Sequence, residues 1–269
     1  MTGLPGAARF AAEVTLPPAV LRVLFAPGNG YAVAVLETGL AALPTSNGLP
    51  SPDEEGHLPV IPVERTANCA GPVAFSPTGS AVAVYCEADG VIRTITGWPT
   101  EPAVAGEFTA PPPGWLAVSD DASALLAAGD SGSALLRRDE EPTSLPEPLS
   151  AATFLPGSTH FVTAGAEIVL HTPESRVIAA LEGAEPVAAM QPGADGTAVL
   201  LLVRGRIWHL ALEAGTLTPL DTAVTATRLT PLADADTFVF SAGEGQPAWI
   251  LSGRLDQPRV YPVPAVQVQ

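Results

Sequence analysis

Short apolar runs separated by turn residues dominate the chain between positions 70 and 110. The runs PVAF (72–75) and AVAVY (81–85) are separated by SPTGS, in which Pro sets one turn dihedral and Gly accepts a positive one. The alternating segment VIRTIT (91–96) and the run AVAGEF (103–108) follow after further turn residues. This pattern predicts four consecutive antiparallel strands, a β-meander.

The same order of runs and turns recurs along the whole chain. The last apolar residues before the first turn of each unit are Phe25, Phe75, Val118, Phe154, Met190 and Leu229. Their average spacing of about 41 residues is typical of β-propeller repeats with four strands per unit. The pattern therefore predicts an all-β protein, a six-bladed β-propeller of four-stranded antiparallel blades, that occupies residues 1–269 as a single domain.

Two other structures compete with this interpretation. A β-sandwich also contains many short strands, with turn signals about every 8–12 residues, but it predicts no repeat of this length. The segment DDASALLAAGD (120–130) contains Ala and Leu, which favour a helix. Its position within the repeat favours a strand instead.

Two segments lie outside the repeat. Residues 9–17 form a spare strand, which we expect to help close the ring against the last blade, because an open ring leaves unpaired strand edges. Residues 45–57 are polar and rich in Pro and Gly, and we expect a loop insertion on one face.

One repeat resembles a known pattern. The segment FSPTGSAVAVYCEADGVIRTIT (75–96) resembles the repeat shared by WD40, TolB-like and YVTN-type propellers. In that repeat, Phe-Ser-Pro-x-Gly joins the first strand to the second and x-Asp-Gly joins the second to the third. The Gly-His and Trp-Asp pairs of WD40 repeats are absent, so the resemblance implies the architecture only.

The charge balance narrows the range of partners. The chain has a formal net charge of -16, and all 12 of its basic residues are arginine. Such a chain repels phosphates and anionic membrane surfaces, which excludes a nucleic-acid partner. The longest clear apolar run, AVLLLV (198–203), is far shorter than the roughly 20 residues that span a bilayer, so we expect no membrane insertion.

The sequence contains no catalytic signature. GxSxG, HExxH and a phosphate-binding glycine loop with Lys are absent, and we expect no cofactor. The four histidines His57, His160, His171 and His209 are far apart in sequence, and His160 and His209 are expected to be structural. The alternative is a calcium or other metal site, assembled from carboxylates of different blades at the channel mouth.

The turns between the second and third strands carry most of the candidate binding residues. These turns share one face of a propeller, and five of the six contain a carboxylate, whereas the other contains Arg204. Together with a tryptophan that enters a first strand on the same face, the predicted binding rim is Glu37, Glu87, Asp89, Trp115, Asp130, Glu167 and Glu244. A ring of carboxylates predicts attraction of a basic protein surface or a cation. Ordinary solvated turns in an acidic chain are the alternative.

The other tryptophans have different predicted positions. Trp98 belongs to a turn between third and fourth strands, on the opposite face, while Trp208 and Trp249 lie within third strands and are expected between blades.

The only two cysteines, Cys69 and Cys86, flank the hairpin around SPTGS. With a two- or three-residue loop they face each other or are one place out of register, and opposed residues lie close enough for a disulfide. We expect this disulfide, which implies a periplasmic or extracellular protein. Two buried thiols in a cytoplasmic protein are the alternative. The amino terminus lacks the features of a secretory leader, which fits either a cytoplasmic chain or one whose leader was removed.

A noncatalytic protein–protein interaction module or scaffold is the function that these observations favour. A metal-dependent hydrolase or lactonase, as some propellers are, is the alternative, and a sensor of a ligand or sugar lies between the two. The hydrolase would require two or three acidic residues that converge on one metal ion.

Overall fold

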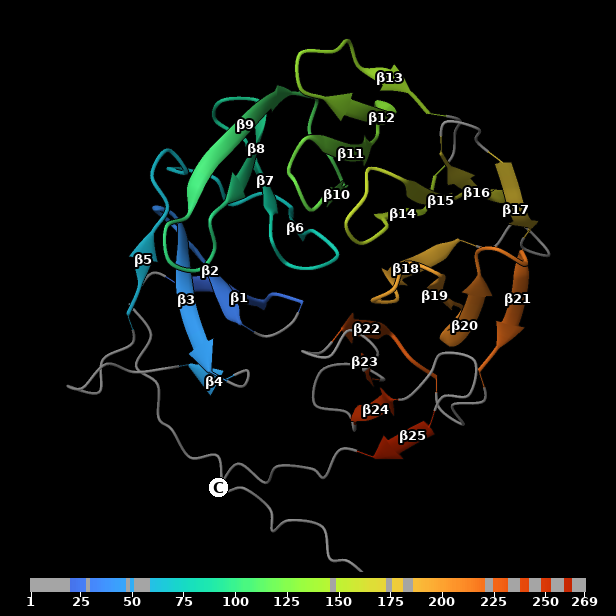
Figure 1. Ribbon diagram of the computed structural model, residues 1–269. Coiled ribbons are helices and arrows are strands. Elements are labelled where there is room, and N and C mark those ends of the chain that lie inside the picture. The colour runs from blue at the N-terminus through green and yellow to red at the C-terminus, as the bar shows by residue number, and fades with distance from the viewer. Residues whose placement is uncertain are drawn as a thin grey trace, which may run out of the picture.

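The computed structural model describes residues 20–27, 30–46, 49–50, 59–145, 149–172, 176–180, 186–220, 225–231, 238–241, 248–252 and 259–262. All regular elements in these residues are strands, and they form one five-stranded and five four-stranded antiparallel sheets. The sheets follow one another around a common axis, with the first strand of each innermost (Figure 1). The protein is therefore a β-propeller, not a β-sandwich.

The first three sheets, numbered in chain order, contain thirteen strands. The first sheet contains β1 (Val20–Phe25), β2 (Tyr31–Leu36), β3 (Gly39–Ser46), β4 (Leu49–Pro50) and β5 (Ile61–Pro62). The second contains β6 (Val73–Phe75), β7 (Val82–Cys86), β8 (Val91–Thr96) and β9 (Ala103–Thr109). The third contains β10 (Trp115–Val118), β11 (Ala124–Gly129), β12 (Gly132–Arg137) and β13 (Thr143–Ser144). Since β11 occupies the segment that could have been helical, the repeat and not the local propensity decides its structure.

The last three sheets repeat the same order. The fourth contains β14 (Ala151–Phe154), β15 (Phe161–Ala164), β16 (Glu167–His171) and β17 (Arg176–Ala180). The fifth contains β18 (Val187–Pro192), β19 (Ala198–Val203), β20 (Arg206–Ala211) and β21 (Thr216–Pro219). The sixth contains β22 (Arg228–Pro231), β23 (Phe238–Ser241), β24 (Ala248–Ser252) and β25 (Arg259–Pro262).

The core lies between neighbouring sheets, because the second strands are apolar on both faces. Along β7, Val82 and Val84 pack against the first sheet, whereas Ala83 and Tyr85 pack against the third. The strand β19 divides its side chains in the same way between the fourth and sixth sheets. Alternate residues of a strand point to opposite faces, so an uninterrupted apolar run is what a strand covered on both sides requires.

The loops between first and second strands repeat one backbone pattern. In the first five sheets, the amide of the first loop residue donates a hydrogen bond of 2.9–3.1 Å to the carbonyl oxygen five positions later. The donor–acceptor pairs are Ala26–Tyr31, Ser76–Ala81, Ser119–Ala124, Leu155–His160 and Gly193–Ala198. The connection at SPTGS is therefore longer than the two or three residues expected from the sequence, and Phe75 pairs with Val82.

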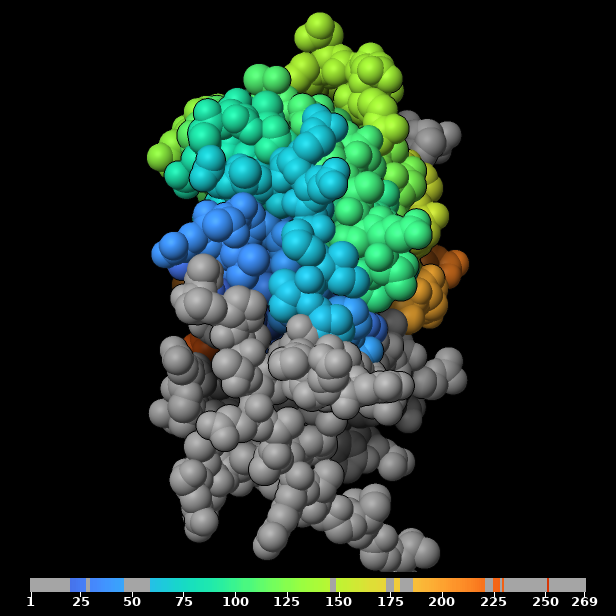
Figure 2. Space-filling model, turned by 90° about the vertical axis from the view of Figure 1, so that its left-hand side faces the viewer, coloured from blue at the N-terminus to red at the C-terminus, as the bar shows by residue number. Residues whose placement is uncertain are grey.

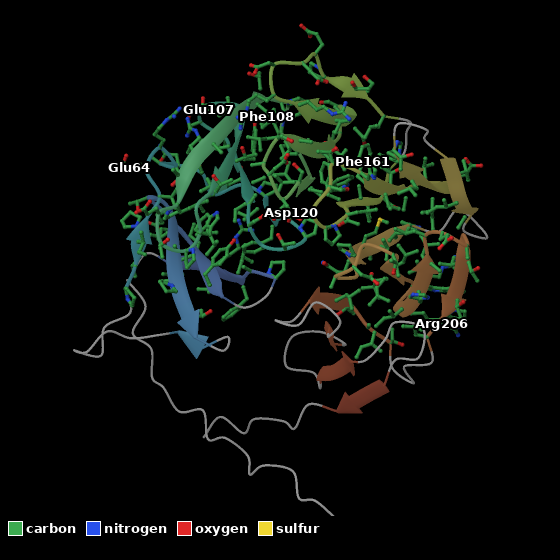
Figure 3. All side chains as sticks on the ribbon, in the orientation of Figure 1. Glu64, Glu107, Phe108, Asp120, Phe161 and Arg206 are labelled. Carbon is green, nitrogen blue, oxygen red and sulfur yellow. A yellow bond between two sulfur atoms is a disulfide. The ribbon has the colours of Figure 1, made fainter. Side chains whose placement is uncertain are left out.

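These loops also connect neighbouring sheets near the ring centre, where Asp120 lies (Figure 3). The Asp120 carboxylate accepts hydrogen bonds from the amides of Thr78 at 2.9 Å and Gly157 at 2.7 Å, so it joins the second, third and fourth sheets. The buried Tyr31 hydroxyl donates to the Gly79 carbonyl at 2.6 Å, which joins the first and second sheets. Burial raises the pKa of Tyr31, so this hydroxyl remains protonated.

The first sheet contains part of the expected insertion at 45–57. The end of β3 forms a small hairpin with β4, in which Thr45 pairs with Pro50, while β5 pairs with β3 farther along. Residues 51–58 and the expected closing strand at 9–17 lie outside the described residues. Figure 2 shows the segment that follows β5 (cyan) on the outer surface, between the first sheet (blue) and β9 (green).

We predict that Tyr31→Phe lowers the free energy of unfolding by about 1–2 kcal/mol, because the buried Gly79 carbonyl loses its hydrogen bond. Urea unfolding at constant pH measures this difference. Thr94→Val is the matched control, since it also removes a buried hydroxyl, but Thr94 Oγ1 has no hydrogen-bond partner among the described residues. We expect Thr94→Val to cost nothing. Equal losses in both variants would contradict the role assigned to Tyr31.

Candidate functional site

The turns between second and third strands place four carboxylates on one face of the ring. Glu37, Glu87, Asp130 and Glu167 come from the first four sheets in order, and all four side chains are exposed. The first three lie in the turns themselves, whereas Glu167 is the first residue of β16 after its turn. We call these four residues the acidic rim. The corresponding turn of the fifth sheet contains Arg204, and the predicted Glu244 lies outside the described residues.

A hollow of about 540 Å³ opens between the inner strands of the first three sheets. Its lining includes Arg22 of β1, Ala70 and Gly71 before β6, Glu87 of the acidic rim and Trp115 of β10. Trp115 is half-buried and packs against the core between the third and fourth sheets. The structure thus brings together two of the predicted rim residues, Glu87 and Trp115.

Arg22 is part of the wall of this hollow. Its Nη2 donates hydrogen bonds to the carbonyl oxygens of Ala70 at 3.0 Å and Gly71 at 2.8 Å. A side chain at Gly71 would not fit, because a Cβ atom there would lie 2.7 Å from the Tyr85 carbonyl oxygen. The segment before β6 is therefore held against both β1 and β7.

Cys69 and Cys86 form a disulfide, and both are buried. The predicted register was wrong, because β6 begins only at Val73 and Cys69 lies in a turn before it. From this turn, Cys69 reaches Cys86 at the end of β7 with a Cα–Cα distance of 4.0 Å. Cys69 therefore does not oppose Cys86 in the ladder, although the two still meet.

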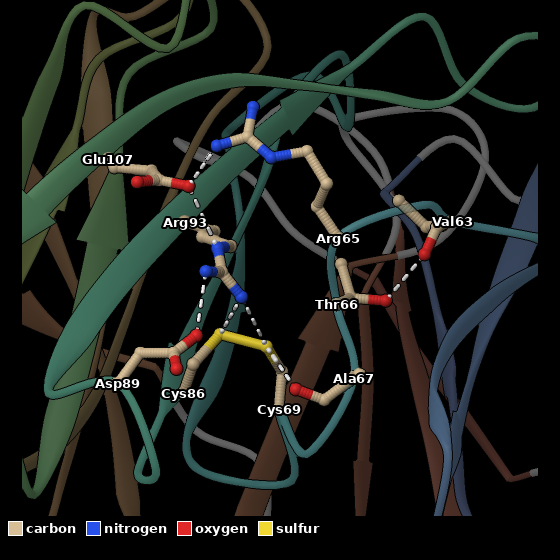
Figure 4. Close-up of polar contacts among 9 residues, drawn as sticks. All are labelled: Val63, Arg65, Thr66, Ala67, Cys69, Cys86, Asp89, Arg93 and Glu107. Carbon is tan, nitrogen blue, oxygen red and sulfur yellow. Dashed lines mark hydrogen bonds and ion pairs between the residues drawn. A yellow bond between two sulfur atoms is a disulfide. The ribbon is translucent and has the colours of Figure 1, made fainter.

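The guanidinium of Arg93 lies against the disulfide (Figure 4). Arg93 Nη1 lies 3.6 Å from each of the two sulfur atoms, and the side chain is only 12% exposed. Its guanidinium pairs with Asp89 at 2.7 Å and with Glu107 at 3.1 Å, and Glu107 also binds Arg65. Two carboxylates offset the cost of burying the guanidinium. Asp89, a predicted rim residue, thus has its carboxylate bound within the protein.

The described residues contain no group of three or more His, Cys, Asp or Glu that could hold a metal ion. His171 stacks on Phe161 with ring centroids 4.3 Å apart, and burial lowers its pKa. His160 is exposed on a loop, His209 lies within β20, and His57 is outside the described residues. The convergence of acidic residues that the hydrolase alternative requires is not found in this part of the chain.

Trp98 and Trp208 pack against other residues of the protein. Trp98, in the turn after β8, stacks on Tyr31 with ring centroids 5.1 Å apart and so joins the first two sheets. Trp208 packs against the core between the fourth and fifth sheets, as predicted. Trp249 lies in β24.

The sequence analysis missed Arg22 and Arg93. Each arginine interrupts an apolar strand, LRVLF or VIRTIT, and a charge in such a position requires partners. That interruption is the signal that could have identified both residues.

We predict that Cys69→Ala/Cys86→Ala lowers the free energy of unfolding by about 3 kcal/mol, because the disulfide closes a short loop in the unfolded chain. Urea unfolding with and without reductant measures the difference. Reductant should destabilise the unaltered protein and leave the double variant unchanged. Two titratable thiols in the unfolded, non-reduced protein would contradict the disulfide.

Comparison with known proteins identifies the fold alone. No protein-family model and no curated protein matches the chain. Among solved structures, the chain is similar to the β-propeller domain of Cps50 (Swd1) from Myceliophteria thermophila, with a TM-score of 0.62 and 10% sequence identity. The match covers 95% of this chain and 90% of that one. The resemblance to WD40-like propellers is thus confirmed at the level of architecture.

Proposed function

We propose that this protein is a noncatalytic interaction module whose acidic rim binds a basic segment of another protein. The observation that carries the proposal is the repetition of exposed carboxylates, Glu37, Glu87, Asp130 and Glu167, in or directly after the turns between second and third strands of four consecutive sheets. Charges of one sign on one face attract a partner of opposite sign and orient its approach. The net charge of -16 acts in the same direction.

The ring supplies the rigidity that an interaction surface needs. Packing between neighbouring sheets and the contacts of Asp120 and Tyr31 fix the sheets relative to one another. A preorganised surface loses less conformational entropy when a partner binds.

We also propose an oxidising compartment, the periplasm or the extracellular space, as the location of the protein. The buried Cys69–Cys86 disulfide supports this location, because such bonds persist mainly outside the reducing cytosol. No helix in the described part of the chain has the length and apolar character needed to cross a membrane.

We predict that Glu37→Arg/Glu167→Arg weakens partner binding, because two positive charges replace two negative ones on the acidic rim. Proteins retained from an extract of the source organism identify a candidate partner, which is then purified and titrated at low and high salt. The loss should be largest at low salt, since salt screens charges on a protein surface.

Glu141→Arg is the control for this experiment. Glu141 is also exposed, but it lies in the connection between β12 and β13, on the opposite face. Equal binding by the double variant and the control at low salt would contradict the acidic rim as the binding surface.

We propose that the function requires no resident metal ion, and a thermal-shift series tests this directly. Calcium, zinc and a chelator are each added to the purified protein, and the melting temperature is measured. We expect no change, whereas a ligand that binds only the folded state would raise it. A clear rise with calcium or zinc would favour the hydrolase alternative.

A further inference from the structure

The segments that line the hollow are linked by the Cys69–Cys86 disulfide and by the contacts of Arg93. Two of its lining residues directly follow the two cysteines, Ala70 after Cys69 and Glu87 after Cys86. The disulfide therefore links the two segments that carry these lining residues. Arg93 strengthens this connection, because it contacts both sulfur atoms and pairs with Asp89 in the same turn as Glu87.

The two charged side chains that line the hollow differ in their partners. Arg22 donates to two main-chain carbonyl groups of the wall. Glu87 is exposed and has no hydrogen bond or ion pair with the described residues. Glu87 is thus the carboxylate of the hollow that is available to a ligand, and Trp115 lines the same hollow.

We propose that this hollow binds one cationic side chain, an arginine or a lysine, from the partner's basic segment. The Glu87 carboxylate is the counter-ion and the Trp115 ring is the aromatic wall, since a cation is attracted to the face of an indole. This inference rests on the proposed function, and it adds a specific anchor to the general attraction of the acidic rim. The hollow is open to solvent along much of its surface, so we expect it to hold one side chain and not to enclose a whole ligand.

The charges around the hollow favour a positively charged ligand. The acidic rim continues on both sides of Glu87, with Glu37 in the first sheet and Asp130 in the third. Arg22 is exposed and keeps its positive charge, but its Nη2 is held by the two carbonyl oxygens, and the three carboxylates Glu37, Glu87 and Asp130 outnumber it. An anion would have to approach through the negative field of these carboxylates. A cation meets attraction along the same path.

A set of short peptides tests the anchor. The probes are the pentapeptide Gly-Gly-Arg-Gly-Gly, acetylated and amidated, and the same peptide with citrulline or Glu in place of Arg. Citrulline keeps the shape of arginine without its charge. We expect the arginine peptide to bind at least about threefold more tightly than the citrulline peptide, and to perturb the Trp115 indole resonance in NMR titrations.

Glu87→Gln and Trp115→Phe should each reduce the preference for arginine over citrulline. Glu167→Gln is the matched control, because it removes the same charge from the same rim but lies outside the hollow. Equal weakening by Glu87→Gln and Glu167→Gln would overturn the anchor and leave the proposed function standing. Tighter binding of the Glu peptide would also overturn it. If both Glu87→Gln and Glu167→Gln bind the partner as tightly as the unaltered protein does, the proposed function itself is contradicted.

The role of the disulfide is tested with the same arginine peptide. The Cys69→Ala/Cys86→Ala variant is titrated at a temperature where near-ultraviolet circular dichroism shows that it is folded. We expect weaker binding of the arginine peptide by about threefold, with its preference over citrulline reduced, because the turn that carries Glu87 is less constrained. Unchanged binding would overturn the positioning role of the disulfide.

Discussion

The burial of both faces of the second strands is the constraint on which the rest of this structure depends. The strands β7 and β19 present apolar side chains alternately to the sheets before and after them, so neither strand can be stable in an isolated sheet. Each sheet requires neighbours, and repetition of the same requirement produces a ring. The positions of the turns follow from this packing, which is why carboxylates far apart in sequence occupy equivalent places on one face.

The same constraint explains why the sequence predicts the fold well. Strands covered on both sides appear as uninterrupted apolar runs, and turn residues at regular intervals separate them, so the repeat is visible without any match to a family. The four strands expected between positions 72 and 108 correspond to β6–β9 with small differences at their ends. Four of the six marker residues, among them Phe25 and Phe154, end their strands as expected, whereas β18 and β22 extend to Pro192 and Pro231.

The hairpin register could not be predicted in the same way, because main-chain hydrogen bonds determine it. The bond from the Ser76 amide to the Ala81 carbonyl closes a loop longer than SPTGS suggests, with Gly79 at a φ of 76°. The cysteines nevertheless meet, since Cys69 lies in a turn and not on a strand. The contacts of Arg22 and Arg93 were equally hidden, because Arg22 binds carbonyl groups 48 and 49 positions away. Sequence spacing carries no signal for such contacts.

The contacts made by the arginines leave the acidic rim negative. Several of the described arginines are bound within the protein: Arg93 to Asp89 and Glu107, Arg22 to carbonyl oxygens of the wall, and Arg138 to the Ala105 carbonyl oxygen. Hydrogen bonds to carbonyl oxygens leave the charge of an arginine intact, but no ion pair among the described residues involves a carboxylate of the acidic rim. In the proposed function, the rim would therefore combine attraction of basic segments with repulsion of acidic ones, and both contribute to selectivity.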